Sequence, residues 1–128
     1  MGESDDAADS LVKVEALDER AALDAMTAAP DHHDVLLENE RVRVLDTRLG
    51  PGETTPVHTH CWPAVLYVLG WSDFIRHDAD GNAILDSRAK AMKPAIGSAL
   101  WSGPLQPHFV TNVGDGELHI IAFELKGS

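Results

Sequence analysis

The sequence is poor in cysteine and in positive charge. Cys61 is the only cysteine among 128 residues, so no disulfide can form within one chain. We therefore expect a protein of the reducing cytoplasm. Only 10 lysines and arginines stand against 21 acidic residues, which gives a formal net charge of −11 at pH 7. This balance argues against a nucleic-acid partner, because phosphate binding needs a basic surface.

Several segments and motifs that would define other classes of protein are also missing. No apolar run approaches the ~20 residues of a membrane span, so we expect no membrane partner. The acidic stretch Met1–Asp6 has neither the basic nor the apolar region of a secretory signal. The sequence contains no G-x-S-x-G motif, no phosphate-binding loop and no G-x-G-x-x-G fingerprint. Known motifs therefore indicate neither a hydrolase nucleophile nor a nucleotide-binding site.

The length and charge distribution indicate one domain with an acidic N-terminal segment. A chain of 128 residues suits a single core. Residues 1–24 contain eight acids against Lys13 and Arg20, which is −6 and more than half of the net charge. We interpret this excess as the solvated face of a helix.

A helix is predicted over residues 10–29, after a disordered stretch over residues 1–9. Ser10 is a plausible N-cap, and Pro30 stops the helical pattern. Between them, apolar residues recur at three- and four-residue steps on one stripe: Leu11, Val14, Leu17, Ala21 and Ala25.

Residues 30–128 are predicted to form a β domain. Turn residues recur throughout, most clearly in Asp78–Asn82, where Asp, Gly and Asn tolerate the positive φ angles of hairpin turns. Between the turns we expect strands at Val35–Leu37, Arg41–Leu49, Thr55–His60, Ala64–Arg76, Ala83–Asp86, Ser98–Trp101, Pro107–Asn112 and Glu117–Lys126. Many short strands with a single helix favour an all-β sandwich or barrel over βαβ units.

Three histidines are the main candidates for a functional site. His58 and His60 lie two residues apart, so on a strand both side chains point to the same face. Two imidazoles on one inward face can approach one ion at ~2.0–2.1 Å. An exposed pair on a strand is the alternative. His108 follows on a later predicted strand, 48 residues after His60.

The spacing of glycines and histidines resembles the two motifs of the cupin family. The first motif of that family reads G-x5-H-x-H-x3,4-E-x6-G, and here Gly52, His58 and His60 match it. The second reads G-x5-P-x-G-x2-H-x3-N, and Gly97, His108 and Asn112 match it with the right spacing. The resemblance implies a double-stranded β-helix, a jelly-roll barrel, with His58, His60 and His108 as metal ligands.

The sequence also departs from both motifs. Ala64 stands where the family has its glutamate ligand, and Trp71 stands where the first motif ends in glycine. Gly103 and Leu105 replace the proline and glycine of the second motif. The resemblance therefore implies three histidine ligands without a carboxylate. Three neutral imidazoles suit iron(II), zinc, nickel or copper. The alternative is a polar, ligand-only pocket that no longer holds a metal.

Other residues are assigned from strand alternation. Trp62, Ala64, Trp101 and Asn112 are predicted to line the pocket; Trp62 could equally cap the barrel end as core, and Asn112 is expected to have a structural role. Cys61 should point away from the two histidines. Arg48 is either an anion clamp on the face of Val42 and Val44 or a surface arginine, and we favour the latter. His119 is predicted on an apolar face with Ile121 and Phe123. His32 and His33 are expected to be solvated.

The functional expectation is a small metal-binding cupin-like protein acting on a small molecule. The resemblance to three-histidine cupins implies a metal-dependent dioxygenase-type oxidoreductase. The alternative is a non-catalytic module that binds a small metabolite. We also expect a homodimer, because an open sheet edge invites pairing and the helix over residues 10–29 needs a surface for its apolar stripe.

Overall fold

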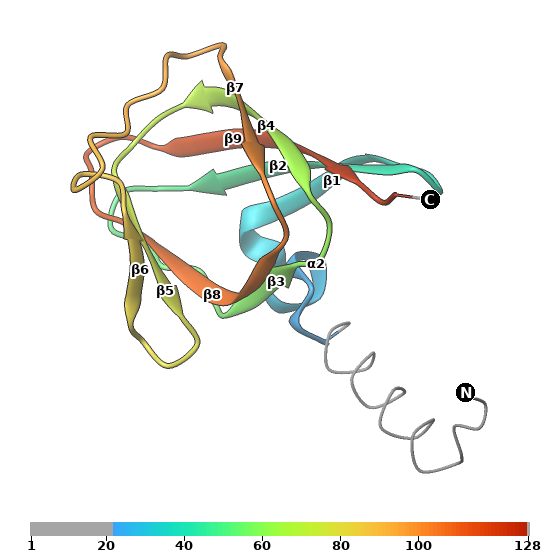
Figure 1. Cartoon of the computed structure of the whole chain (residues 1–128), viewed down its shortest axis with the longest axis horizontal. Coiled ribbons are helices and arrows are strands. Elements are labelled where there is room, and N and C mark those ends of the chain that lie inside the picture. Colours follow the sequence, from blue (N-terminus) through green and yellow to red (C-terminus); the bar gives the residue numbers. More distant parts are fainter. Residues whose placement is uncertain (1–21, 128) are drawn as a thin grey trace, which may run out of the picture.

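The computed structural model describes residues 22–127 and is built almost entirely of strands (Figure 1). A short helix, α2 (Ala25–Ala28), and a 3-10 turn at Pro30–His32 precede the first strand. The strands are β1 (His33–Glu38), β2 (Val42–Leu49), β3 (His58–His60), β4 (Ala64–Gly70), β5 (Phe74–Asp78), β6 (Ala83–Asp86), β7 (Ala99–Ser102), β8 (Leu105–Asn112) and β9 (Leu118–Leu125).

These strands follow the predicted ones closely, with one exception. The long strand predicted over Ala64–Arg76 is divided into β4 and β5, because the chain leaves the sheet at Trp71–Asp73. The predicted helix over residues 10–29 and the predicted disorder over residues 1–9 lie largely outside the described residues. In the part of that helix that is described, α2 begins after Asp24, whose side chain accepts a hydrogen bond from the Met26 N–H.

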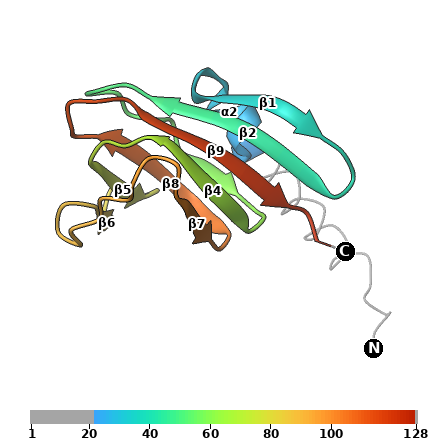
Figure 2. The ribbon, with the colours of Figure 1, turned by 90° about the horizontal axis from the view of Figure 1, so that it is seen from above.

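The strands form two sheets that enclose an interior (Figures 1 and 2). One sheet has five strands in the order β1-β2-β9-β4-β7, and the other has four in the order β3-β8-β5-β6. The paired strands are antiparallel, and consecutive strands repeatedly change sheet. Strands β2 and β9 are in register over eight pairs, from Val42 opposite Leu125 to Leu49 opposite Leu118.

The two motif glycines occupy turns that require them. Gly52 has a φ of 78° and Gly97 a φ of 87°, a region that residues with a Cβ rarely adopt. Gly52 lies in the turn between β2 and β3, and Gly97 lies in the turn that leads into β7. The number of residues between each glycine and its histidine is therefore the number between a turn and the strand that carries the candidate ligand.

Buried polar and charged residues are as frequent as buried apolar ones among the described residues. The buried apolar residues include Leu45, Leu49, Val68 and Phe74. The buried charged and polar residues among them are His33, Arg43, Thr55, His58, Ser72, Ser87, His108, Asn112 and Glu124. Buried polar groups lower stability unless they are paired, so this concentration marks a site rather than an ordinary core. No helix among residues 22–127 has the length and apolarity to cross a membrane.

Apolar side chains also run across the outer face of the five-stranded sheet. The strand register places Leu37, Val44, Phe123, Val65 and Trp101 in one row across β1, β2, β9, β4 and β7. Leu37, Phe123 and Trp101 are exposed at the surface. The face that carries His119, Ile121 and Phe123 is thus apolar, as predicted, but it is turned outward.

Candidate metal centre

Strands β3 and β8 bring His58, His60 and His108 together. His58 lies directly opposite His108 in the antiparallel pair, and the register shifts by one residue before His60 meets Leu105. The side chains of all three line the same internal cavity. The alternation expected for the pair two residues apart therefore holds, and the alternative of an exposed pair on a strand does not apply.

His33 is a fourth member of this cluster that the sequence analysis placed in solvent. It is the first residue of β1, opposite Thr47 on β2, and only 2% of its surface is exposed. The 3-10 turn at Pro30–His32 directs the chain so that the ring enters the cavity. The prediction for His33 was wrong because β1 begins two residues earlier than expected. The half-buried His32 is held outside the cluster by contact of its Nδ1 with the Arg48 carbonyl.

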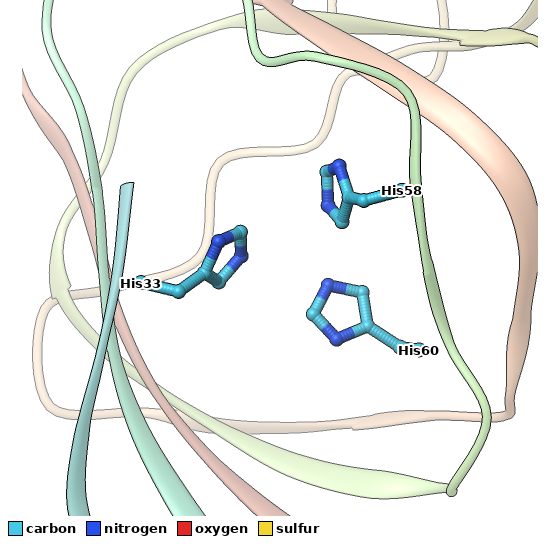
Figure 3. A group of neighbouring side chains, drawn as sticks. All are labelled: His33, His58 and His60. Carbon is cyan, nitrogen blue, oxygen red and sulfur yellow. The ribbon is translucent and has the colours of Figure 1, made fainter. Parts of the chain in front are cut away.

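The rings of His33, His58 and His60 converge on one point (Figure 3). One ring nitrogen from each of the three lies within 4.8 Å of the other two. Ring centroids are 5.0 Å apart for His33 and His58, 5.3 Å for His33 and His60, and 5.0 Å for His58 and His60. The ring of His108 adjoins them, 4.4 Å from that of His58 and 5.8 Å from that of His60.

Each of the four rings is oriented by a hydrogen bond from Nδ1. His33 donates to the Ala29 carbonyl at 2.9 Å, His58 to the Pro56 carbonyl at 2.8 Å, and His108 to the Gln106 carbonyl at 2.7 Å. His60 donates to Glu124 Oε2 at 2.9 Å. Because a carbonyl or carboxylate can only accept, each Nδ1 carries the proton. In a neutral ring this leaves Nε2 with a free lone pair, the arrangement found in metal-binding histidines.

Burial keeps three of these rings neutral. It lowers the pKa of His33 to about 4, that of His58 to about 3 and that of His108 to about 4. The hydrogen bonds to carbonyls oppose this shift, and the neighbouring histidines add to it. Neutral imidazole is the form that binds a metal, so these rings need not lose a proton before they coordinate an ion at pH 7.

A buried ionic network holds His60 in place. Glu124 is fully buried, and its Oε1 accepts a hydrogen bond from Arg43 Nε at 2.6 Å while Oε2 accepts from His60. The other two nitrogens of Arg43 contact both carboxylate oxygens of Asp24 at 2.9 Å. Burial alone would raise the pKa of Glu124, but the hydrogen bonds with His60 and Arg43 outweigh it and lower that pKa. Glu124 is therefore a carboxylate, and it fixes the proton on His60 Nδ1.

The donor set suits a divalent transition metal. Imidazole nitrogens are typical ligands of iron(II), zinc, nickel and copper. Ala64 is buried and lines the cavity where the resemblance placed a glutamate ligand. It lies opposite Glu124 on β9, so a carboxylate does enter this part of the site, although it contacts His60 and Arg43. His33 adds a nitrogen donor on the opposite sheet.

The histidines open into a cavity of about 130 Å³. Trp62 and Ala64 line it, and Trp62 also stacks under the Arg43 guanidinium at 5.0 Å. Much of the remaining wall is aliphatic or aromatic, namely Leu49, Leu66, Phe74, Leu105, Val110, Leu118 and Ile120. The site is thus a polar cluster at one side of an apolar chamber.

Two residues expected to line the pocket lie elsewhere. Trp101 pairs with Val65 on the outer face of β7 and is 64% exposed, and the next two residues, Ser102 and Gly103, line the cavity. The reason is strand alternation: Ser102 lies opposite the inward-facing Ala64, so Trp101 faces outward.

Asn112 is buried, but its side chain forms hydrogen bonds with the backbone at the end of the barrel. Its amide nitrogen donates to the carbonyls of Leu49 and Gly116 at 2.8 and 2.9 Å. Its amide oxygen accepts from Ser72 Oγ and the Gly114 N–H at 2.7 and 3.0 Å. With four hydrogen bonds inside the protein, Asn112 joins three loops and has the structural role expected for it.

Comparison with solved structures defines the class of fold. The chain has the cupin double-stranded β-helix fold, as predicted: many solved cupin and RmlC-like structures match it with a probability of 1.00. Searches of protein-family models and of curated proteins each return no match.

Three of these structures indicate the range of the likeness. A cupin domain from Bordetella pertussis Tohama I is 23% identical, with a TM-score of 0.60 over 74% of this chain and 92% of that one. An RmlC-like cupin from Methanocaldococcus jannaschii is 14% identical, with a TM-score of 0.52 over 73% and 77%. The polyketide cyclase RemF from Streptomyces resistomycificus is 18% identical, with a TM-score of 0.50 over 78% and 68%.

Proposed function

We propose that this protein binds a divalent transition-metal ion through its histidine cluster and uses it in a dioxygenase-type oxidation of a small molecule. The observation that supports the metal site most strongly is the set of Nδ1 hydrogen bonds. In His33, His58, His60 and His108, the Nδ1 proton is held by a carbonyl or by Glu124. The nitrogens left for an ion are the four Nε2 atoms.

We assign the ligands to Nε2 of His33, His58 and His60, because one ring nitrogen of each lies within 4.8 Å of the other two. His108 adjoins the same centre and is either a fourth ligand or a hydrogen-bonding group for a bound molecule. The three-histidine set of His58, His60 and His108, implied by the resemblance, is the competing assignment. An ion with three nitrogen ligands keeps positions for water or substrate, as a catalytic site requires.

Such an ion would supply Lewis-acid and redox chemistry to a molecule in the cavity. The protein's own groups would prepare the site for it. The apolar walls exclude water, which strengthens electrostatic interactions inside. Glu124 maintains the tautomer of His60, and the backbone carbonyls maintain those of His33, His58 and His108.

The polyketide cyclase RemF shares this fold, and at 18% identity it supports the fold alone. A non-catalytic metabolite-binding module remains the competing function. It predicts the same cavity but no dioxygen consumption. Dioxygen consumption by the metal-loaded protein therefore separates the two functions.

The test is metal analysis of protein purified without added metal, by inductively coupled plasma mass spectrometry. We expect about one equivalent of a transition metal in the wild type and a loss of at least tenfold in metal affinity in His58→Ala and in His33→Ala. The matched control is His119→Gln, a histidine that contacts Asp46 at 2.7 Å on the outer side of β9. It should keep the full metal content.

A screen for dioxygen consumption with small carboxylates, thiols and catechols then tests catalysis. Metal-dependent uptake that is lost in His58→Ala supports the oxidoreductase. A metal-loaded protein that consumes no dioxygen with any of them favours the binding module. Full metal occupancy in His33→Ala together with its loss in His108→Ala would restore the ligand set implied by the resemblance.

A further inference from the structure

Arg76 is a charged side chain inside the cavity that the metal centre does not use. It lies on β5 and lines the same chamber as the histidines. Its partner across the sheet is Val110 on β8, and His108 lies two residues before Val110 on the same inward face. Arg76 and His108 are therefore diagonal neighbours on adjacent strands, within reach of a long side chain. The positive charge of Arg76 is one cause of the lowered pKa of His108.

The guanidinium of Arg76 has no anionic partner among residues 22–127. Its Nε is buried and without a hydrogen-bond acceptor, and its Cζ lies over the Phe74 ring, 5.9 Å from the ring centroid. The buried arginine Arg43, in contrast, is paired with both Asp24 and Glu124. A buried guanidinium Nε without an acceptor costs free energy, so one beside a cavity is explained by a ligand that supplies the missing acceptor.

The charge of the chamber points to an anion. Among the lining residues that the structure describes, Glu124 is the only acid, and both of its oxygens are engaged by His60 and Arg43. The network of Asp24, Arg43 and Glu124 carries one net negative charge. A divalent ion at the histidines would exceed that charge, and Arg76 adds a further positive charge.

The shape of the chamber limits the size of this anion. A cavity of roughly 150 Å³ holds a molecule such as benzene, and the chamber here has about 130 Å³. Its walls beside Arg76 are apolar, formed by Phe74 on the same strand and Val110 on the next. A compact molecule with an acidic group and a short apolar body matches both features.

We infer that the molecule bound in this cavity is a small organic acid whose carboxylate pairs with Arg76 while its remaining part faces the histidine cluster. The guanidinium offers a planar fork of N–H donors that matches the two oxygens of a carboxylate. This inference deepens the proposed function, because it names the substrate class of the same cavity. The contact with Arg76, however, requires no metal.

The test uses metal-free protein and two probes of the same shape, 3-methylbutanoate and its neutral amide, 3-methylbutanamide. Calorimetric or NMR titration should show that the acid binds at least about tenfold more tightly than the amide, as expected for a charge-assisted hydrogen-bonded pair. Arg76→Met should remove this preference. Arg76→Lys, which keeps the charge but not the fork, should retain only part of it.

Arg88→Gln is the matched control. Arg88 is an exposed arginine paired with Asp86, two residues earlier in the chain, so this variant changes the net charge equally and leaves the cavity alone. It should bind both probes as the wild type does. Equal binding of acid and amide by the wild type, binding of neither, or an unchanged preference in Arg76→Met would each overturn the inference.

Thermal stability separates a ligand-binding arginine from a structural one. Because Arg76 lacks a partner, Arg76→Met should leave the melting temperature of the metal-free protein unchanged or raise it. A lower melting temperature would give Arg76 a structural role and contradict the inference. If the acid binds through Arg76 but the wild-type protein holds no metal, the proposed function fails and the inference stands. If the wild-type protein holds metal but binds the acid and the amide equally, the proposed function stands and the inference fails.

Discussion

Replacing Glu124 by glutamine probes how the buried network controls the histidine centre. The carboxylate accepts hydrogen bonds from Arg43 Nε at 2.6 Å and from His60 Nδ1 at 2.9 Å. A glutamine amide has the same shape but offers one acceptor and one donor. In either orientation of the amide, its NH2 group faces an N–H of Arg43 or of His60.

Because Arg43 cannot lose its proton, the group that changes its hydrogen bonding is His60. We expect its proton to move from Nδ1 to Nε2, so that Nδ1 can accept from the amide. This tautomer has no lone pair on Nε2 for a metal. Loss of a carboxylate that orients a metal-binding histidine typically costs 10–100-fold in metal affinity, and we expect a loss in that range here.

The same substitution should destabilise the fold. Breaking a buried ion pair costs about 3–5 kcal/mol. Arg43 keeps its two contacts with the partly exposed Asp24, which argues for the lower end, about 3 kcal/mol. For a domain of this size that corresponds to a fall of roughly 12 °C in melting temperature.

Differential scanning calorimetry of the metal-free protein and competitive metal titration measure the two effects. Glu117→Gln is the control, since Glu117 is exposed and lies 3.8 Å from the exposed Arg48. It should change the melting temperature by no more than about 2 °C. A Glu124→Gln protein with wild-type stability and wild-type metal affinity would refute the role assigned to this network.

Three further outcomes are expected. The pKa values of His33, His58 and His108, lowered by burial to about 4, 3 and 4, lie below the ~6.5 of an unfolded histidine. The unfolded chain therefore takes up protons first as the pH falls, and denaturation of metal-free protein should show stability dropping below pH 6.5 by up to ~1.4 kcal/mol per pH unit for each ring; a flat profile down to pH 4.5 would contradict their neutral burial. Ala64→Glu should tighten manganese(II) binding by at least about tenfold, ~1.4 kcal/mol, because the new carboxylate is a hard oxygen donor facing the cavity; equal affinities by calorimetry would count against this register. The expected homodimer would use the apolar row on the outer sheet face, so sedimentation should detect a dimer at micromolar concentration that Phe123→Ser weakens, and a wild-type monomer throughout that range would exclude it.

Much of the fold could be predicted because turns and strands are marked by different residue types. Asn39 precedes β2, and its side chain accepts hydrogen bonds from the backbone of Arg41 and Val42, which is why that turn is evident from sequence. The break between β4 and β5 was missed because Trp71 continues an apolar run. Gly70, Ser72 and Asp73, which are typical turn residues, were the available signal.

The site was predictable where local spacing determines it. Alternation on one short strand places His58 and His60 on the same face, and the turn at Gly97 fixes the distance to His108. His33 was missed because its position depends on the pairing of β1 with β2, which is a long-range property. Because His32 and His33 are adjacent, the sequence also does not show which of the two side chains faces inward. The pair His32 and His33 just after a helix-ending proline was the available signal.

Glu124 and Arg43 escaped prediction for a related reason. In β9 both faces are largely apolar, with Leu118, Ile120 and Ala122 inward and Ile121 and Phe123 outward. Hydrophobicity alone therefore could not decide which face is buried. The inward face is the one that carries the charge, because Glu124 is paired with Arg43, its cross-strand neighbour on β2. On β2 the inward residues likewise include Arg43 and Leu45, so Arg48 is a surface residue paired with Asp46.

The central claim is that a transition metal binds to the Nε2 atoms of the histidine cluster. X-ray absorption spectroscopy of the metal-loaded protein tests it most directly. The prediction is a shell of at least three nitrogen neighbours at ~2.0–2.1 Å with the multiple-scattering pattern of imidazole. The spectrum should be unchanged in Cys61→Ser, because Cys61 is an exposed residue next to His60. A sulfur neighbour at ~2.3 Å, or a metal with oxygen neighbours alone, would contradict the account.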